Sequence, residues 1–223
     1  MINSIKIGDV TVTASPTAKN LGATFDDTMS LKPHVNALVK SCNFQLRSIG
    51  QARKFLTKDA TEKVLHAFIS SRLDNGNSLL CRLPDYIVGK LQRVQNTAAR
   101  ILTRTRKCDH ISPVLRSLHW LPVAQRIQFK ILTLTFKCLH NKAPQYLMDL
   151  IKTHDQASDR GNMRSSNKFL LKLPDSNHPT MGDRSFAVAA PTLWNDLPLE
   201  IRSCDTFETF KSKLKTYLFA KES

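Results

Sequence analysis

The sequence has few glycines, few acidic residues and no long apolar run. Seven glycines in 223 residues, none in a nucleotide-binding motif, argue against a glycine-rich phosphate-binding fold. Eighteen carboxylates against 33 lysines and arginines give a net charge of +15. This excess favours polyanionic partners, nucleic acid first and acidic membrane surfaces second, over a merely solvated basic surface. No run reaches the 18 or so apolar residues of a membrane span, and residues 1–14 lack a signal-peptide core, so we expect an intracellular protein, cytoplasmic or nuclear.

Cysteine usage gives no sign of a disulfide framework or a zinc module. The five cysteines are odd in number and scattered, and no Cys-x-x-Cys pair occurs. We therefore expect free thiols in a reducing compartment, most of them small buried residues. Cys108, His110 and His119 could be imagined as metal ligands, but their spacing fits no common zinc module.

Evidence for catalytic residues is also weak. Asp26 and Asp27 are adjacent, and polymerases bind two magnesium ions through aspartates on a strand turn. The polymerase pattern places one residue between an aromatic side chain and the aspartates, whereas Phe25 directly precedes Asp26. We interpret the pair as the exit of a strand and the approach to a helix. No spacing indicates a Ser/His/Asp or Cys/His arrangement, so no catalytic or metal-binding residue is assigned.

The most informative stretch is residues 84–107, which predicts an amphipathic helix with a basic face. Pro84 and Asp85 suit its first turn, because proline needs no donor there and an acid complements the helix dipole. No carboxylate follows Asp85 within this helix. The apolar face would be Ile87, Leu91, Val94, Ala98, Ile101 and Leu102. The polar face would carry Lys90, Arg93, Thr97, Arg100, Arg104 and Lys107.

The positive charge continues beyond this helix. Residues 84–130 contain nine cations, including Arg116 and Arg126, against only Asp85 and Asp109. We predict that seven of them contact nucleic-acid phosphates, which positions a duplex without reading its sequence. The seven are Lys90, Arg93, Arg100, Arg104, Lys107, Arg116 and Arg126.

The expected fold is a mainly α multi-helix bundle with a small N-terminal antiparallel β-element. Residues 5–7 and 10–12 alternate around Gly8 and predict a hairpin, and residues 18–25 predict a third strand with Gly22 at a bulge or close approach. Helices should begin after caps at Ser30 and Thr57 and, near the C-terminus, at Asp205 or Thr206. Residues 185–190 fit either a short strand or a helical turn.

Two aromatic stretches could serve either packing or ligand binding. Trp120, near Arg116 and Arg126, could stack on a base or sugar, but a tryptophan between packed helices is more often core. Trp194 lies in a second such stretch without a local charge excess, and we interpret it as core.

Six ordered blocks carry a family resemblance that covers nearly the whole chain. They are KNLGATFD (19–26), SRLDNGNSLL (71–80), LQRVQNTAARIL (91–102), LHWLPVAQRIQFK (118–130), APTLWNDLP (190–198) and FKSKLKTYLF (210–219). The first resembles the strand near the end of the palm in LINE-type (non-LTR) retrotransposon reverse transcriptases. The other five are similar to the region after the polymerase core in the jockey and chicken-repeat-like clades.

The resemblance implies a remnant of an RNA-directed DNA polymerase. It places the magnesium-binding aspartates of the family upstream of Leu21 and Gly22, with no matching position in this chain, so we expect neither a cofactor nor enzymatic activity of the chain itself. Leu21 and Gly22 would lie on the primer-side strand, and the helices along a primer-template duplex of RNA or DNA. This makes nucleic acid the preferred partner over a membrane, together with the missing palm.

The expected division of the chain follows the same resemblance. Residues 1–29 would be terminal palm strands, 30–152 a thumb-like helical region, 153–161 a linker, and 162–223 a C-terminal region ending in an amphipathic helix. The alternative is a non-catalytic basic helical domain that binds proteins and self-associates through unpaired strands.

Overall fold

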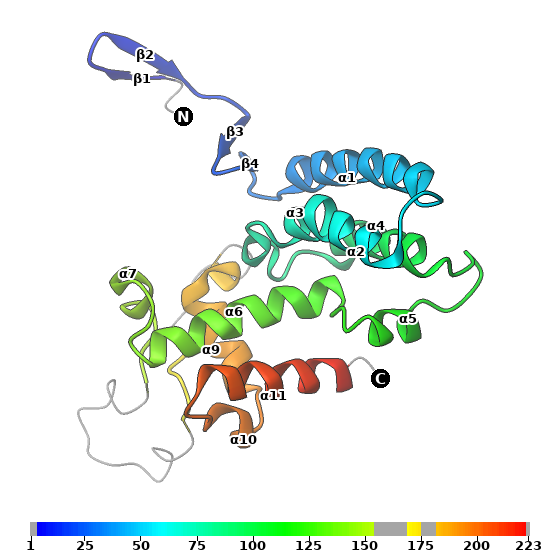
Figure 1. Cartoon of the computed structure of the whole chain (residues 1–223). Coiled ribbons are helices and arrows are strands. Elements are labelled where there is room, and N and C mark those ends of the chain that lie inside the picture. Colours follow the sequence, from blue (N-terminus) through cyan, green and yellow to red (C-terminus); the bar gives the residue numbers. More distant parts are fainter. Residues whose placement is uncertain (1–3, 154–168, 175–181, 222–223) are drawn as a thin grey trace.

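The structure is a computed structural model that describes residues 4–153, 169–174 and 182–221. It is mainly α-helical, with two small antiparallel hairpins at the N-terminus, which confirms the predicted fold class (Figure 1). The strands are β1 (Ser4–Ile7), β2 (Val10–Thr13), β3 (Thr17–Asn20) and β4 (Ala23–Asp26). The longer helices are α1 (Lys32–Ala52), α2 (Lys58–Leu65), α4 (Asp85–Thr103), α6 (Val123–Leu139), α9 (Phe186–Asn195) and α11 (Phe207–Ala220). The shorter ones are η1 (His66–Ser70), α3 (Ser71–Asp74), η2 (Asn77–Leu80), α5 (Ser112–Ser117), α7 (Gln145–Met148), η4 (Gly182–Arg184) and α10 (Leu199–Arg202).

The first hairpin forms as predicted but has no covering layer. β1 and β2 pair Ile5 with Val12 and Ile7 with Val10, around a turn in which Gly8 has φ of 59°. Paired residues on one face place these four apolar side chains together, and each is 50–67% exposed. Figure 1 shows this hairpin projecting away from the helices. Its apolar face is therefore open to solvent in this chain.

The second hairpin corrects the prediction of one strand over residues 18–25. β3 and β4 pair Asn20 with Ala23, so Leu21 and Gly22 form a two-residue turn rather than the interior of one strand. Their φ angles are 47° and 85°, the positive values that a tight hairpin turn requires. Leu21 is an unusual residue for that conformation, which is why the pattern was taken for a continuous strand.

The start of α1 also differs from the predicted cap at Ser30. The residue before the helix is Leu31, whose φ is 56°, and no side chain of its own caps the helix. Asp26, at the end of β4, instead accepts hydrogen bonds from the backbone N–H groups of Ser30 (2.9 Å) and Leu31 (2.7 Å). Pro33 lies in the first turn as expected. A strand residue therefore holds the entry to the helix.

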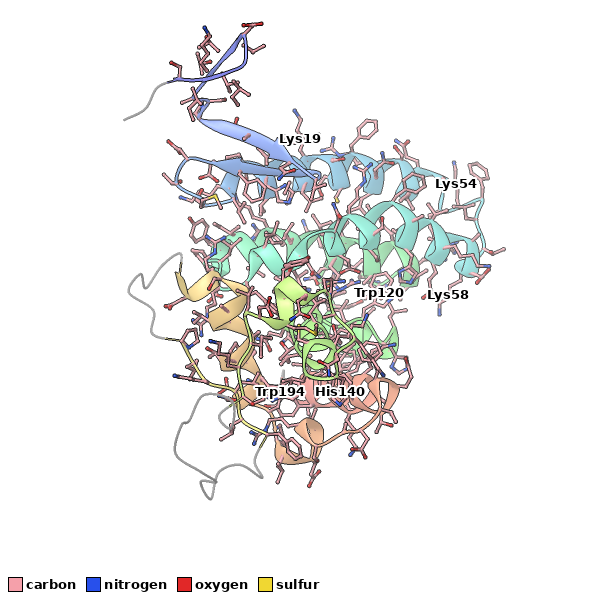
Figure 2. All side chains as sticks on the ribbon, turned by 90° about the vertical axis from the view of Figure 1, so that its left-hand side faces the viewer. Lys19, Lys54, Lys58, Trp120, His140 and Trp194 are labelled. Carbon is pink, nitrogen blue, oxygen red and sulfur yellow. The ribbon has the colours of Figure 1, made fainter. Side chains whose placement is uncertain are left out.

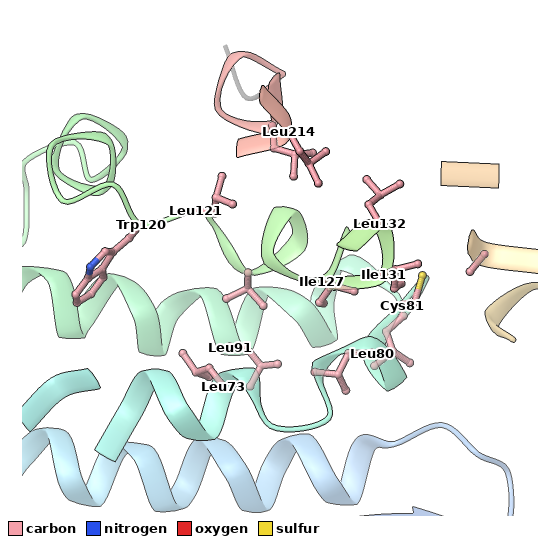
Figure 3. Packing of buried hydrophobic residues seen from close by; sticks show 14 of the residues in the cluster. Leu73, Leu80, Cys81, Leu91, Trp120, Leu121, Ile127, Ile131, Leu132 and Leu214 are labelled. Atoms are coloured by element: carbon pink, nitrogen blue, oxygen red, sulfur yellow. The ribbon is translucent and has the colours of Figure 1, made fainter. Parts of the chain in front are cut away.

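The helices stack in successive layers about one apolar core (Figure 1). α4 lies in the middle, and its fully buried Leu91 lies between Leu73 of α3 and Ile127 of α6 (Figure 3). All six predicted apolar positions of α4 are buried or half-buried. Removing a leucine from such a site costs about 2–5 kcal/mol of stability, so the apolar face of α4 organises the bundle.

The C-terminal region shares this core instead of having its own. Phe136 of α6 stacks on Phe210 of α11 with ring centroids 4.4 Å apart, and Phe210 stacks on Trp194 of α9. Residues 30–152 and 162–223 are thus parts of one packed unit where they are described. The predicted linker lies outside the described residues except Thr153, which forms an isolated β-bridge with Leu171.

Some helix ends lie where the sequence predicts them, and others do not. The side chains of Thr57 and Thr206 accept hydrogen bonds from Ala60 and Thr209, which confirms both predicted caps. α4 stops at Thr103, short of the predicted end at Lys107, because Arg104 adopts a left-handed conformation with φ of 59°. Residues 185–190 belong to the start of helix α9.

Candidate nucleic-acid interface

The basic helix α4 lies alongside α1, and the two run in the same direction. Near their N-termini, Lys32 Nζ lies 5.8 Å from the ring centroid of Tyr86, and Lys90 Nζ donates to Asn36 Oδ1 at 2.7 Å. Near their C-terminal ends, a Cβ atom at Gly50 would lie 3.8 Å from Ile101 Cδ1. These contacts trace one seam along both helices.

One stripe of α1 borders this seam. Because successive helical residues are about 100° apart, every residue of the stripe falls within an arc of about 80° that includes the contacts to α4. All six of its residues are exposed: Lys32, Asn36, Lys40, Asn43, Arg47 and Gly50. α1 contains no aspartate or glutamate. The stripe therefore adds three cations and no anion.

The polar face of α4 borders the seam from the other side. Arg93 and Arg104 are exposed, and Lys107 is exposed in the turn that follows the helix. Within the helix, only Asp85 of the first turn is acidic. We call the joint surface the α1–α4 face; its cations are Lys32, Lys40, Arg47, Lys90, Arg93, Arg100, Arg104 and Lys107.

Two of the predicted phosphate ligands on α4, Lys90 and Arg100, make contacts within the protein. Lys90 donates to Asn36, as described. Arg100 donates to the carbonyl oxygens of Arg106 and Asp109, the latter at 2.8 Å. Its guanidinium thus holds the turn that carries Lys107. Arg100 therefore stabilises the turn at the end of the α1–α4 face and also adds a positive charge to it.

The C-terminal end of α4 is fixed from α1. Arg53, directly after α1, donates from Nε to the carbonyl oxygen of Ile101 at 3.1 Å and from Nη2 to that of Leu102 at 3.3 Å. A guanidinium at this end satisfies carbonyl groups that have no partner within the helix and complements the dipole. The contact keeps the two basic stripes in register.

The predicted set of seven cations does not form a single site. Arg116 is exposed on α5, and Arg126 of α6 is ion-paired with Asp74 on another side of the core. The other five lie along α4 and its following turn. The prediction grouped them because they are close in sequence, although the turn at residues 119–122 reverses the chain before α6.

Two glutamines of α4, the buried Gln95 and the half-buried Gln92, anchor the helix opposite its basic face. Gln95 Nε2 donates to the carbonyl oxygen of Leu121 at 2.8 Å, and Gln92 Oε1 accepts from Val123 N, the first residue of α6, at 2.8 Å. Two glutamines one turn apart thus hold the start of the next long helix. Their role is structural.

The acidic pair has the role that its position at a strand exit indicated. Both oxygens of Asp26 accept hydrogen bonds, and Thr28 Oγ1 donates to one of them at 2.6 Å. These bonds, that from Thr28 first, outweigh partial burial and hold the pKa of Asp26 well below its usual range. Asp27 is exposed and accepts from Thr28 N. Within the described ranges, no group of three or more His, Cys, Asp or Glu side chains is arranged to hold a metal ion.

Thiols and tryptophans follow their predictions. All five cysteines are free, and only Cys108 among them is exposed. Burial raises the pKa values of the Cys42, Cys81 and Cys138 thiols. Trp194 is 1% exposed and Trp120 7% exposed, so both tryptophans belong to the core (Figure 2).

The contribution of α1 to the interface was missed by the sequence prediction. The signal was present as a helix without acids, with Lys32, Lys40 and Arg47 on one side. Only the packing of α1 on α4 shows that this side borders the basic face of α4. Composition alone could not supply that juxtaposition.

Comparison of the chain with protein-family models, with curated proteins and with solved structures finds no significant match. The resemblance to reverse transcriptases therefore stays a prediction. Across the described residues, no helix combines the length and the apolarity needed to cross a bilayer.

Proposed function

We propose that this chain binds nucleic-acid duplex through phosphate contacts on the α1–α4 face. The observation that carries the proposal is the cationic surface along two parallel helices, in which the acidic residues are Asp85 at the start of α4 and Asp109 in the turn after it. Lys40, Arg47, Arg93, Arg104 and Lys107 are exposed there and can reach a phosphate backbone. Such contacts position a duplex and carry no sequence information.

Within this proposal the chain is a non-catalytic remnant of a retrotransposon reverse transcriptase. The support is the ordered resemblance of its sequence blocks, in which no position matches the catalytic aspartates. The duplex would then be a primer-template of RNA and DNA. Polymerase chemistry is assigned to no residue here, so metal-dependent nucleotide incorporation by this chain should be undetectable.

The proposal predicts a steep salt dependence. Fluorescence anisotropy of a labelled primer-template duplex, titrated at several salt concentrations, measures it. Five phosphate contacts would give a slope of log affinity against log salt of about −4 to −5, because counterions are released from the duplex. A slope near zero would contradict phosphate-based binding.

A second candidate function is favoured by the uncovered apolar face of the β1–β2 hairpin. Four exposed aliphatic side chains on one face are typical of a surface that is covered in a complex. The alternative of a protein-interaction domain then predicts self-association and weak, salt-insensitive duplex binding. Size-exclusion chromatography with light scattering distinguishes the two candidate functions. A monomer that binds duplex contradicts the alternative. If a dimer forms through the hairpin, a Val12→Lys variant should dissociate it into monomers.

A further inference from the structure

A hollow of about 620 Å³ lies on a different side of the core from the α1–α4 face. Its walls come from η1, the end of α3, the start of η2, the Trp120 loop, α6 and α11. These segments are distant in sequence and meet only in the folded chain. A volume of this size is typical of sites for small organic ligands.

One wall is aromatic. The imidazole ring of His66 lies against Trp120, with ring centroids 5.3 Å apart, and Phe129 also lines the hollow. Trp120 is buried behind, whereas the side chain of His66 is about half exposed. Ser70 Oγ is hydrogen-bonded with His66 Nδ1 at 3.2 Å, and Glu62 lies 3.7 Å from Nε2. His66 is thus an oriented flat ring that a second ring can stack on.

A π-helical turn, η1, begins beside this wall. It interrupts the α2–α3 helix from His66 to Ser70, and such single turns recur at functional sites. His66 directly continues α2, so the extra residue rotates the segment that follows, including Asp74 at the end of α3, relative to α2.

A second part of the lining, which we call the rim, is cationic. Arg126, Lys130, Lys211 and Lys215 line it. Asp74 pairs with Arg126 and Glu208 with Lys211. In the part of the chain that the structure describes, no carboxylate lies within 4 Å of the ammonium groups of Lys130 or Lys215. These two lysines leave the rim ready for an anionic group.

Polar groups between the wall and the rim could bind a heterocycle edge. Asn77 is only 4% exposed and lines the hollow; its amide nitrogen lies 3.5 Å from Asp74 Oδ1, and its Oδ1 has no hydrogen-bond partner. A buried amide oxygen without a donor is destabilising. A small rotation of this amide would let a ligand N–H satisfy it.

From a flat stacking ring, an unsatisfied buried amide and a cationic rim, we propose that this hollow binds a nucleoside 5′-phosphate. The base would stack on His66, and the phosphate would lie between Lys130 and Lys215. The nucleotide can be free or an unpaired residue of a strand. The site is separate from the α1–α4 face, so it goes beyond duplex binding and can fail or hold independently.

Isothermal titration calorimetry of the full chain at low salt tests this site. The probes are deoxyadenosine 5′-monophosphate, deoxyadenosine and inorganic phosphate. The monophosphate should bind at least tenfold more tightly than either part alone, because base stacking and the phosphate contact each contribute. Equal binding of inorganic phosphate and the monophosphate would overturn the proposal, as would no binding of the monophosphate.

Variants locate the binding. His66→Ala should weaken binding of the monophosphate about tenfold, because it removes the stacking ring. His66→Phe should retain this binding. Lys130→Gln/Lys215→Gln should weaken it to a similar degree, and Arg93→Gln/Arg104→Gln on the α1–α4 face should leave it unchanged. Circular dichroism melting confirms that each variant is folded. Loss of binding in the Arg93/Arg104 variant alone would place the ligand elsewhere and overturn the assignment.

A hexameric oligodeoxyadenylate distinguishes the two sources of the nucleotide. It is titrated into the Arg93→Gln/Arg104→Gln variant, so that the α1–α4 face contributes little. Binding at least tenfold tighter than that of the monophosphate supports the proposal with a strand as the ligand, and comparable binding supports it with a free nucleotide. Binding of the hexamer that His66→Ala leaves unchanged would overturn it.

Discussion

Asp26 shows how one carboxylate can determine the entry to a helix. It ends a strand, and its two oxygens accept from Thr28, Ser30 and Leu31. Ser30 looked like the cap because serine is common there and precedes the helix directly. Its hydroxyl donates to Asp26 at 2.7 Å and accepts a longer bond of 3.3 Å from Lys32 N, at the start of α1. The residues that form this cap lie within five positions of one another, but the sequence does not show which of them pair.

Asp26→Asn should lower the free energy of unfolding at pH 7, because an amide cannot accept all of these hydrogen bonds. The pKa of Asp26 is lowered in the folded chain, so its stabilisation is complete above the ordinary aspartate pKa of about 4. It is lost as the pH falls from there towards the lowered value. Urea unfolding at pH 7 and pH 3 should therefore show a smaller difference between variant and wild type at the lower pH. An unchanged difference would contradict this role.

Leu21→Asn should stabilise the hairpin of β3 and β4. Leu21 is 95% exposed and has φ of 47°, so it makes no packing contribution that offsets its left-handed conformation. Asn-Gly is the preferred pair for such turns, and the gain should reach about 1 kcal/mol. Thermal and urea unfolding measure it. Leu21→Ala is the control, since it removes the same side chain without the turn preference; equal stabilisation by both would refute the conformational argument.

Elements with a local signal were predicted, and those set by distant contacts were not. Thr57 and Thr206 cap their helices through neighbouring backbone groups, so sequence spacing was enough to find them. The apolar periodicity of α4 likewise located its buried face. The end of α4 was misplaced because Arg104 adopts a left-handed conformation there, where Arg53, from the end of α1, binds the last carbonyl groups. The turn at Leu21 was missed because leucine rarely adopts positive φ.

Each candidate site is formed by segments that are distant in the sequence, so the sequence alone could predict only part of each site. The cations of α4 were predicted from spacing, but α1 joins them only through the seam at Asn36 and Gly50. The hollow around His66 combines residues of η1, α3, η2, the Trp120 loop, α6 and α11, and it had no sequence signal beyond Trp120 and Arg126. Two of the six sequence blocks, residues 91–102 and 118–130, contact each other through Gln92 and Val123.

The central claim is that duplex binds to the α1–α4 face and not to positive charge in general. Arg93→Gln/Arg104→Gln removes two charges from that face, and Lys142→Gln/Lys152→Gln removes two exposed charges near α7. Anisotropy titrations of one primer-template duplex, with both variants and the wild type at the same salt concentrations, compare them directly. The account predicts at least tenfold weaker binding for the first variant, with a salt slope shallower by about two, and less than twofold change for the second. Equal losses in both variants, or none in the first, would contradict it.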